Sequence, residues 1–155
     1  MKKQYWLMKS EPETYSIDQL AKDKTTWWEG VRNYQARNFM TQKMKLGDAV
    51  LFYHSNAKPS GAIGIAEVSQ LAAPDKLQFD PKSEYFDPKA SKEKPIWHCV
   101  QVKFKSKFKK VISLDEMRKT PALKNMLVLQ KGSRLSIQPL TEAEFEFLKS
   151  EGDQN

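Results

Sequence analysis

Apolar runs separated by turn residues predict a protein rich in β-strands. Residues 5–9 and 49–54 are nearly continuous apolar stretches of strand length, which is typical of buried strands. Residues 97–108 instead alternate between apolar and polar positions with a period of two. The predicted strands are residues 5–9, 49–54, 62–68, 97–108 and 135–138. Gly64, inside one of them, predicts a bulge or a close backbone approach.

Helix starts are marked by side chains that can cap free backbone amides. A Ser or Thr followed three residues later by Glu or Gln forms a capping box. Three such pairs are predicted to start helices: Ser16 with Gln19, Ser113 with Glu116, and Thr141 with Glu144. Asn33 is a further candidate N-cap, for a helix that runs to about Met44. We therefore expect four short helices in the connections and at the C-terminus.

Residues 74–95 contain four prolines and are predicted to form a long loop without a regular helix. The aromatic residues Phe79, Tyr85 and Phe86 argue against disorder, because disordered segments are poor in aromatic side chains. Long ordered loops in compact domains are often functional. The order of elements predicts an α+β fold, with a mostly antiparallel sheet that can close into a barrel.

Length and charge restrict the class of protein and its partners. A chain of 155 residues fits one domain, which we expect over residues 1–150, followed by an acidic C-terminal tail at 151–155. The net charge is +7, and residues 1–140 carry +11 because the last fifteen residues are acidic. A basic body favours a polyanionic partner, although solubility alone accounts for such a charge equally well.

Cysteine usage and hydropathy indicate the compartment. Cys99 is the only cysteine, so an internal disulfide cannot form, which suits a reducing cytoplasm. The sequence has no run of eighteen apolar residues and no apolar stretch of signal-peptide length near its N-terminus. We expect a soluble, cytoplasmic monomer with no membrane partner.

The most informative part of the chain is the stretch from Trp28 to Asn38. It reads WEGVRNYQARN and combines two aromatic rings, two arginines, two asparagines and a glutamine in eleven positions. Rings beside planar hydrogen-bonding groups are what a pocket for a nucleobase requires. The forked donors of Arg32 and Arg37 suit phosphate. The amide of Asn33 can match a base edge, cap the helix, or do both.

Two short segments close to strands carry further candidate binding groups. Trp27 and Trp28 could supply one wall of an aromatic cage, and we expect one ring to pack inward while the other faces a pocket. Lys9 and Ser10 end the first predicted strand, where they could hydrogen-bond a ligand edge. A simple turn at Ser10 is the more economical interpretation of that pair.

Polar residues at the end of the second apolar run, and a lysine stripe, are the remaining candidates. His54, Ser55 and Asn56 could line the mouth of a cavity, or simply lead into a loop. In the segment 103–109 an extended strand would place four lysines, Lys103 and Lys105 among them, on one face and both phenylalanines on the other. This stripe could follow a phosphate backbone, but we favour lysines that protect an edge strand from aggregation.

Signatures of catalysis and of metal binding are missing from the sequence. It lacks a Gly-x-Ser-x-Gly elbow, a Walker loop and a dinucleotide-binding glycine pattern. His54 and His98 are far apart, and Cys99 would project to the face opposite His98. A relay of Ser10 and His54 requires the fold to bring the two together. We therefore expect no cofactor, no metal and no enzymatic activity.

Several segments, in this order and over nearly the whole chain, closely resemble the EVE domain. The matching residues are 5–12 (YWLMKSEP), 28–38, 52–56 (FYHSN), 64–66 (GIA), 78–81 (QFDP) and 136–139 (SIQP). The chain is similar to the compact stand-alone members found in bacteria. The resemblance implies a PUA-like fold, a mixed pseudobarrel with several short helices packed around it, as in the PUA, ASCH and YTH domains.

The resemblance also implies a pocket that takes one flipped-out modified base between aromatic side chains. By this similarity Ser10 matches a serine that borders the pocket of YTH domains, and Trp28 matches the cage tryptophan. Asn33, Tyr34 and the segment His54 to Asn56 fall where the EVE cleft is lined. Phe79 or Tyr85 could replace the YTH loop that supplies the second wall, which differs here.

We therefore predict a nucleic-acid-binding module for a modified base, either DNA carrying a base such as 5-methylcytosine or modified RNA. The alternatives are a nucleic-acid-modifying enzyme on a PUA-like fold, a pocket for a free modified nucleotide, and a structural or partner-binding protein. The predicted base pocket comprises Lys9, Ser10, Trp28, Asn33, Tyr34, His54, Ser55, Asn56, Phe79 and Tyr85. The predicted phosphate ligands are Arg32, Arg37, Lys103 and Lys105.

Overall fold

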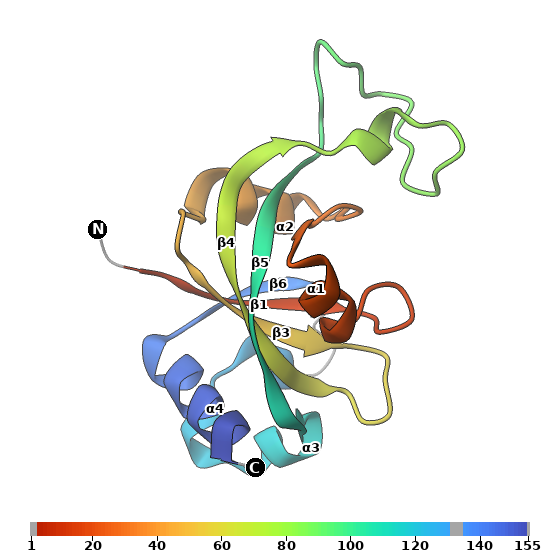
Figure 1. The fold of residues 1–155 in the computed structure, drawn as a ribbon. Coiled ribbons are helices and arrows are strands. Elements are labelled where there is room, and N and C mark those ends of the chain that lie inside the picture. Colours follow the sequence, from red (N-terminus) through yellow and green to blue (C-terminus); the bar gives the residue numbers. More distant parts are fainter. Residues whose placement is uncertain (1–2, 131–134, 155) are drawn as a thin grey trace.

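The computed structural model describes residues 3–130 and 135–154 and centres on a six-stranded sheet (Figure 1). Its strands are β1 Tyr5–Ser10, β2 Thr25–Trp27, β3 Ala49–His54, β4 Gly61–Pro74, β5 His98–Ser113 and β6 Ile137–Leu140. They lie in the order β2-β5-β4-β3-β1-β6. β1 and β3 pair in parallel, and the other neighbouring pairs of described strands are antiparallel. The predicted α+β fold is confirmed, with β2 as a strand that the sequence pattern did not reveal.

Short helices fill the connections between strands. The α-helices are α1 Ile17–Asp23, α2 Tyr34–Asn38, α3 Leu114–Arg118 and α4 Glu142–Gln154. A π-helical turn, η1 Phe39–Lys43, continues α2, and the 3₁₀ turns are η2 Lys76–Phe79, η3 Pro121–Leu123 and η4 Leu127–Leu129. Within residues 3–130 and 135–154 no helix has the length and apolar character needed to cross a bilayer.

Side-chain caps begin these helices where the sequence predicts them. The amide of Gln19 donates to Ser16 Oγ at 3.1 Å, and the amide of Ala36 donates to Asn33 Oδ1 at 2.9 Å. Both halves of the capping box are formed at the two later helices, by Ser113 with Glu116 and by Thr141 with Glu144. Local sequence therefore determines the starts of these helices.

The sheet carries a hydrophobic layer on each face. One layer contains Met8 and Phe52 and is completed by the first helices, through Ile17, Leu20, Ala36 and Met40. The other contains Leu7 and Leu51 and is completed by the C-terminal elements, through Met117, Leu123, Met126, Phe145 and Leu148. Consecutive residues along β1, and likewise along β3, therefore point into different layers. In Figure 1, α2 lies above β1 and β6, and α3 and α4 lie below them.

A β-bulge in β5 sends the two phenylalanines of the lysine-rich segment to different faces. Phe104 and Ser106 pair with consecutive residues of β4, so Lys105 is an extra residue in the ladder. Phe104 packs against the layer beneath α1 and α2, whereas Phe108 is buried in the layer against α3 and α4. The prediction that both rings share one face is therefore wrong, because the extra residue reverses the alternation.

Two glycines allow elements to approach each other closely. A Cβ on Gly64 would lie 2.6 Å from the carbonyl oxygen of Ser106, which confirms the predicted close approach in β4. A Cβ on Gly152 would lie 2.3 Å from the ring of Phe108, so α4 docks there on β5. α4 runs through Gly152 to Gln154, and therefore enters the acidic segment 151–155.

Residues 75–97 form an ordered connection between β4 and β5, with η2 as its one short helical turn among the described elements. Gln78 is fully buried inside it. Its Nε2 donates to the carbonyls of Asp75 and Trp97 at 2.8 and 2.7 Å, and its Oε1 accepts from the amides of Ile96 and Trp97 at 2.9 and 2.8 Å. One buried side chain thus joins the two ends of the loop, which lies beyond the ends of β4 and β5 in Figure 1.

Candidate functional site

A cavity of about 490 Å³ opens where segments far apart in the sequence meet. Its walls come from the end of β1, the turn that follows, β2, residues 28–32, and the loop between β4 and β5. This volume lies within the range of roughly 300–1,000 Å³ that is usual for small-molecule pockets. The predicted pocket residues Lys9, Ser10, Trp28 and Tyr85 all line it, and so does Arg32.

Aromatic side chains form several walls of the cavity. Trp28 is only 7% exposed and packs edge-on against Phe52, with ring centroids 5.5 Å apart. Trp27, at the end of β2, is half-buried. Tyr15 and Tyr85 also line the cavity. Both tryptophans line the cavity and pack on the same core cluster, and Trp28 is the more deeply buried of the two. The division into one inward ring and one pocket-facing ring stays a prediction.

Two opposite charges also border the cavity. The side chains of Lys9 and Glu29 are both half-buried. Desolvation lowers the pKa of the Lys9 ammonium and raises the pKa of the Glu29 carboxyl; for Glu29 the nearby Lys76 and Arg32 oppose the shift and Asp75 adds to it. Neither group forms a side-chain hydrogen bond or an ion pair with another described residue.

The guanidinium of Arg32 is directed inward and fastens the loop to the cavity wall. Its Nε and Nη2 donate to the carbonyl of Tyr85 at 3.1 and 2.9 Å, and its Nη1 donates to Asp75 Oδ2 at 3.0 Å. The same group lies 5.4 Å from the ring centre of Tyr85 and 5.2 Å from that of Trp97. Most of its donors are thus engaged within the protein, and its predicted contact with phosphate stays a prediction.

Asp75 and Gly30 complete this junction. Asp75 is 1% exposed and accepts hydrogen bonds from the amides of Gly30 and Leu77, each at 2.8 Å. Gly30 has a φ of +87°, and a Cβ there would lie 3.0 Å from the ring of Tyr85. Glycine is therefore required at this position both for its left-handed backbone and for the close ring.

Several predicted pocket residues do not line this cavity. The exposed Asn33 caps α2, which confirms one of its two predicted roles. Tyr34 is 59% exposed and stacks on Trp97 with ring centroids 4.8 Å apart. Phe79 lies half-buried at the end of η2. None of these three residues is in the lining of the cavity, and their contact with a base stays a prediction.

The segment His54 to Asn56 forms hydrogen bonds with the turn after β1 and with the start of α1. His54 Nε2 accepts from the amide of Ile17 at 3.1 Å, and burial lowers the pKa of the imidazole. The amide of Ser55 donates to the carbonyl of Ser10 at 3.1 Å. Asn56 Nδ2 donates to Glu11 Oε1 at 3.4 Å. These contacts position the turn after β1.

Ser10 and His54 are register partners in the parallel β1–β3 pair, so the fold does make them neighbours. Their side chains are engaged elsewhere, however. Ser10 Oγ donates to the carbonyl of Tyr15 at 2.6 Å, while His54 accepts from a backbone amide. The buried Cys99 is also unsuited to nucleophilic work, because desolvation raises its pKa to about 12. Among the described residues no cluster of three or more His, Cys, Asp or Glu side chains could hold a metal ion.

The other predicted phosphate ligands also have partners within the fold. Arg37 donates to Asn38 Oδ1 and to the carbonyl of Ile96, and lies 4.8 Å from the ring centre of Tyr34. Lys103 and Lys105 lie 3.2 and 4.0 Å from carboxylate oxygens of Glu67. Both lysines keep nearly half of their side chains exposed, so solvent-side contacts are open to them.

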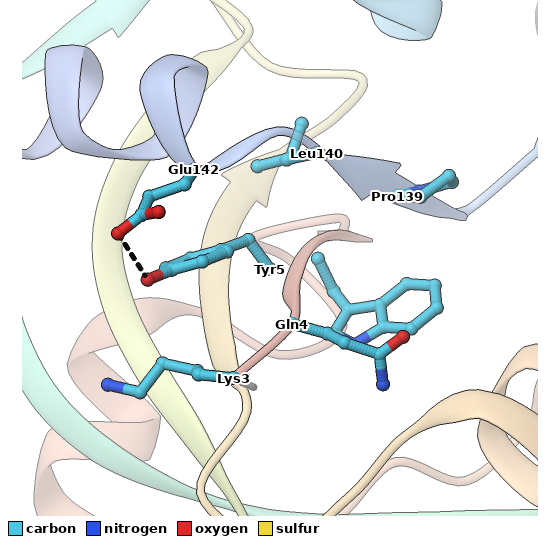
Figure 2. Close-up of a pocket in the computed structure, with 7 residues that line it drawn as sticks. Lys3, Gln4, Tyr5, Pro139, Leu140 and Glu142 are labelled. Atoms are coloured by element: carbon cyan, nitrogen blue, oxygen red, sulfur yellow. Dashed lines mark hydrogen bonds between the residues drawn. The ribbon is translucent and has the colours of Figure 1, made fainter. Parts of the chain in front are cut away.

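A smaller hollow of about 260 Å³ lies at the edge of the sheet between β1 and β6 (Figure 2). The hydroxyl of Tyr5 donates there to Glu142 Oε2 at 3.3 Å and joins β1 to the start of α4. The Tyr5 ring packs on Phe145, and the Trp6 indole donates to the buried Asp48 at 3.0 Å. Both rings are occupied in this way, so the hollow offers little for stacking a ligand.

Comparison with known proteins identifies the family. The fold and the cavity define a small α+β domain with an aromatic-walled cleft. A family model described as the EVE domain matches residues 4–151. Thymocyte nuclear protein 1 of Gallus gallus is 44% identical over 94% of this chain and 67% of that protein; the Homo sapiens protein is 41% identical over 94% and 72%. The chain belongs to the EVE domain family, as its motifs predicted.

Solved structures support the same assignment. A hypothetical protein from Leishmania major has a TM-score of 0.93 and 47% identity, over 99% of this chain and 96% of its own. Human thymocyte nuclear protein 1 in complex with DNA containing 5-methylcytosine has a TM-score of 0.88 and 42% identity, over 98% and 99%. An ASCH protein from Zymomonas mobilis shares the fold alone, with a TM-score of 0.54 and 11% identity. The expected PUA-like architecture is confirmed.

Proposed function

We propose that this chain binds nucleic acid and holds one modified base, turned out of its stack, in the cavity beside Trp27, Trp28 and Tyr85. The observation that carries the proposal is the combination in one cavity of aromatic walls with polar and charged groups at the ends of β1 and β2. Enzymes and readers that recognise single bases use this combination, in which rings stack on the base faces while polar groups meet its edges.

The solved relative makes DNA with 5-methylcytosine the first ligand to test. Human thymocyte nuclear protein 1 is described in complex with DNA containing that base, and it shares 42% of its residues with this chain. The net charge of +7 favours a polyanion as partner. RNA with a modified base, and a monomeric, cytoplasmic protein, remain predictions.

We infer that the module is not catalytic. Ser10 and His54, the two residues of the conceivable relay, are both engaged in holding the fold: Ser10 Oγ bonds within the turn after β1, and His54 accepts at the start of α1. A reader needs only to stack on a base and recognise its edge, and the cavity has groups for both tasks. The residues beside the cavity, Asn33 and Tyr34 among them, are proposed to contact the flanking nucleotides.

A panel of fluorescent oligonucleotides tests the proposal. Each would carry one central 5-methylcytosine or cytosine, as single-stranded DNA, duplex DNA or RNA, with affinity measured at two salt concentrations. We expect tighter binding to the methylated oligonucleotide. The affinity should fall as salt rises, because phosphate contacts release counterions, while the preference for the methylated base should persist.

A free nucleotide provides the comparison that separates a reader from a small-molecule pocket. 5-Methyldeoxycytidine monophosphate would be titrated as a competitor of the bound oligonucleotide. Weak competition is expected, because one nucleotide lacks the flanking phosphates. Equal affinity for nucleotide and oligonucleotide, unaffected by salt, would contradict the nucleic-acid proposal and favour a nucleotide pocket.

A further inference from the structure

Two opposite charges in the cavity have no direct hydrogen bond or ion pair within the part of the chain that the structure describes. Lys9 extends from the end of β1, and Glu29 from the segment after β2, so the two line the same space from different elements. No nitrogen–oxygen pair between them lies within 4.0 Å, and among the described residues neither side chain has another hydrogen-bond or ion-pair partner. The guanidinium of Arg32, by contrast, is paired with Asp75 at 3.0 Å.

Leaving these two groups unmatched is unfavourable for the folded chain. Burial lowers the pKa of Lys9 and is the main cause of the raised pKa of Glu29, to which Asp75 adds and which Lys76 and Arg32 oppose. Removing a charged group from water costs free energy unless a hydrogen bond or an opposite charge replaces the lost solvation. A ligand that brings a donor to Glu29 and an acceptor to Lys9 would supply the two missing partners at once.

Resting on the proposed function, we propose that Glu29 and Lys9 read the edge of an aminopyrimidine, the class of base that includes cytosine and 5-methylcytosine. The Glu29 carboxylate accepts a hydrogen bond from the exocyclic amine at ring position 4, and the Lys9 ammonium donates to the ring carbonyl oxygen at position 2. Acceptance by a carboxylate from the cytosine amine is an established pairing in base recognition. Thymine presents a carbonyl oxygen in place of that amine, and the carboxylate would repel it.

Thymine and 5-methylcytosine form a matched pair of ligands for the test. Both carry the same ring, methyl group and carbonyl at position 2, and they differ at positions 3 and 4. Affinities would be measured by fluorescence anisotropy for otherwise identical oligonucleotides with one or the other base at a central unpaired site. The parent protein should prefer 5-methylcytosine by about tenfold, toward the lower end of the range for one well-formed base contact.

Variants at the two positions should change different quantities. Glu29→Gln should abolish or reverse the preference, because its amide can donate to the thymine carbonyl. Lys9→Met should weaken both oligonucleotides alike, since the carbonyl at position 2 is common to them. Glu13→Gln is the matched control, because it changes the net charge by the same amount as Glu29→Gln. Glu13 is exposed and lies outside the cavity lining. It should leave the ratio of affinities unchanged.

The outcomes separate this inference from the proposed function. If the parent binds 5-methylcytosine DNA selectively and Glu29→Gln retains the full preference over thymine, the edge-reading role is wrong and the reader proposal stands. If the parent binds no methylated oligonucleotide better than its unmodified form, the proposed function fails. Tighter, Glu29-dependent binding of guanine would overturn the aminopyrimidine class. Melting curves identify any misfolded variant. If Glu29→Gln is misfolded, Glu29→Ala replaces it, and this variant should lose the preference without reversing it.

Discussion

Asp75 accepts a hydrogen bond from the amide of Gly30 at 2.8 Å, although 45 residues separate them in the chain. The same carboxylate oxygen accepts from Arg32 Nη1 at 3.0 Å. This junction fixes the loop between β4 and β5 against the segment that carries Trp28. Cavity shape therefore depends on one buried carboxylate that has no counterpart in a local sequence motif.

Replacing this carboxylate should damage both stability and binding. Asp75→Ala leaves Arg32 and the Gly30 amide without their acceptor, and we expect a loss of about 3 kcal/mol in the free energy of unfolding. Asp80→Ala, an exposed position in the same loop, should change it by less than about 1 kcal/mol. Urea denaturation of both variants measures the difference. Equal, small losses would mean that the junction contributes little.

Two glycines with the same backbone angle offer a matched comparison. Gly30 and Gly47 have φ values of +87° and +86°, but a Cβ would meet the Tyr85 ring at the first position and nothing within 4 Å at the second. Gly47→Ala should lose roughly 1 kcal/mol of stability from backbone strain alone. Gly30→Ala should lose more, and it alone should weaken oligonucleotide binding, because the ring must move. Indistinguishable variants would exclude a role for the Tyr85 contact.

The adjacent tryptophans should respond differently to truncation. Trp28 is buried against Phe52, so Trp28→Ala should destabilise the fold by about 3–5 kcal/mol. Trp27 is more accessible, so Trp27→Ala should retain most stability and lose roughly 1–3 kcal/mol of binding free energy through stacking. Thermal melting and anisotropy on the same samples distinguish the two effects. A stable Trp28→Ala protein that no longer binds would reverse these assignments.

His54 should make stability sensitive to mild acid. Burial is the main cause that holds the pKa of its imidazole below the ordinary value of 6.5. The nearby Lys107 lowers the pKa further, and Asp18 opposes the shift. As the pH falls below 6.5 the unfolded chain binds a proton that the folded chain resists, so stability decreases.

The control for this effect is His54→Gln, whose carbonyl can still accept from the amide of Ile17. The melting temperatures of parent and variant would be compared between about pH 7.5 and pH 5. The variant should lose less stability than the parent over that interval. Parallel decreases would show that other groups are responsible.

Local chemistry explains which parts of the fold could be predicted. Ser16, Asn33, Ser113 and Thr141 cap helices because their side chains bond to amides two or three residues away, and such contacts are visible in sequence. The bulge at Lys105 was not visible, because the alternation of lysine and phenylalanine continues through it. β2 was missed because three residues of an edge strand have no distinctive period.

In the candidate site, too, residues with a local sequence signal were predictable and residues defined by distant contacts were not. Ser10, Trp28 and Tyr85 were identified from motif and residue type, and they line the cavity. Glu29 lies in the most informative stretch of the sequence but was not assigned a role, because its significance depends on a cavity formed by distant elements. Asp75 was likewise hidden, since its partners lie about 45 residues away in the chain.

The change of face in β5 has a consequence for how the domain unfolds. One continuous strand contributes Phe104 to the layer near the cavity and Phe108 to the layer against α4, so neither layer can separate without breaking the same backbone ladder. Unfolding should therefore be a single cooperative transition. A ligand seated in the cavity should also slow amide hydrogen exchange in α4, on the far side of the sheet, because global opening exposes both together.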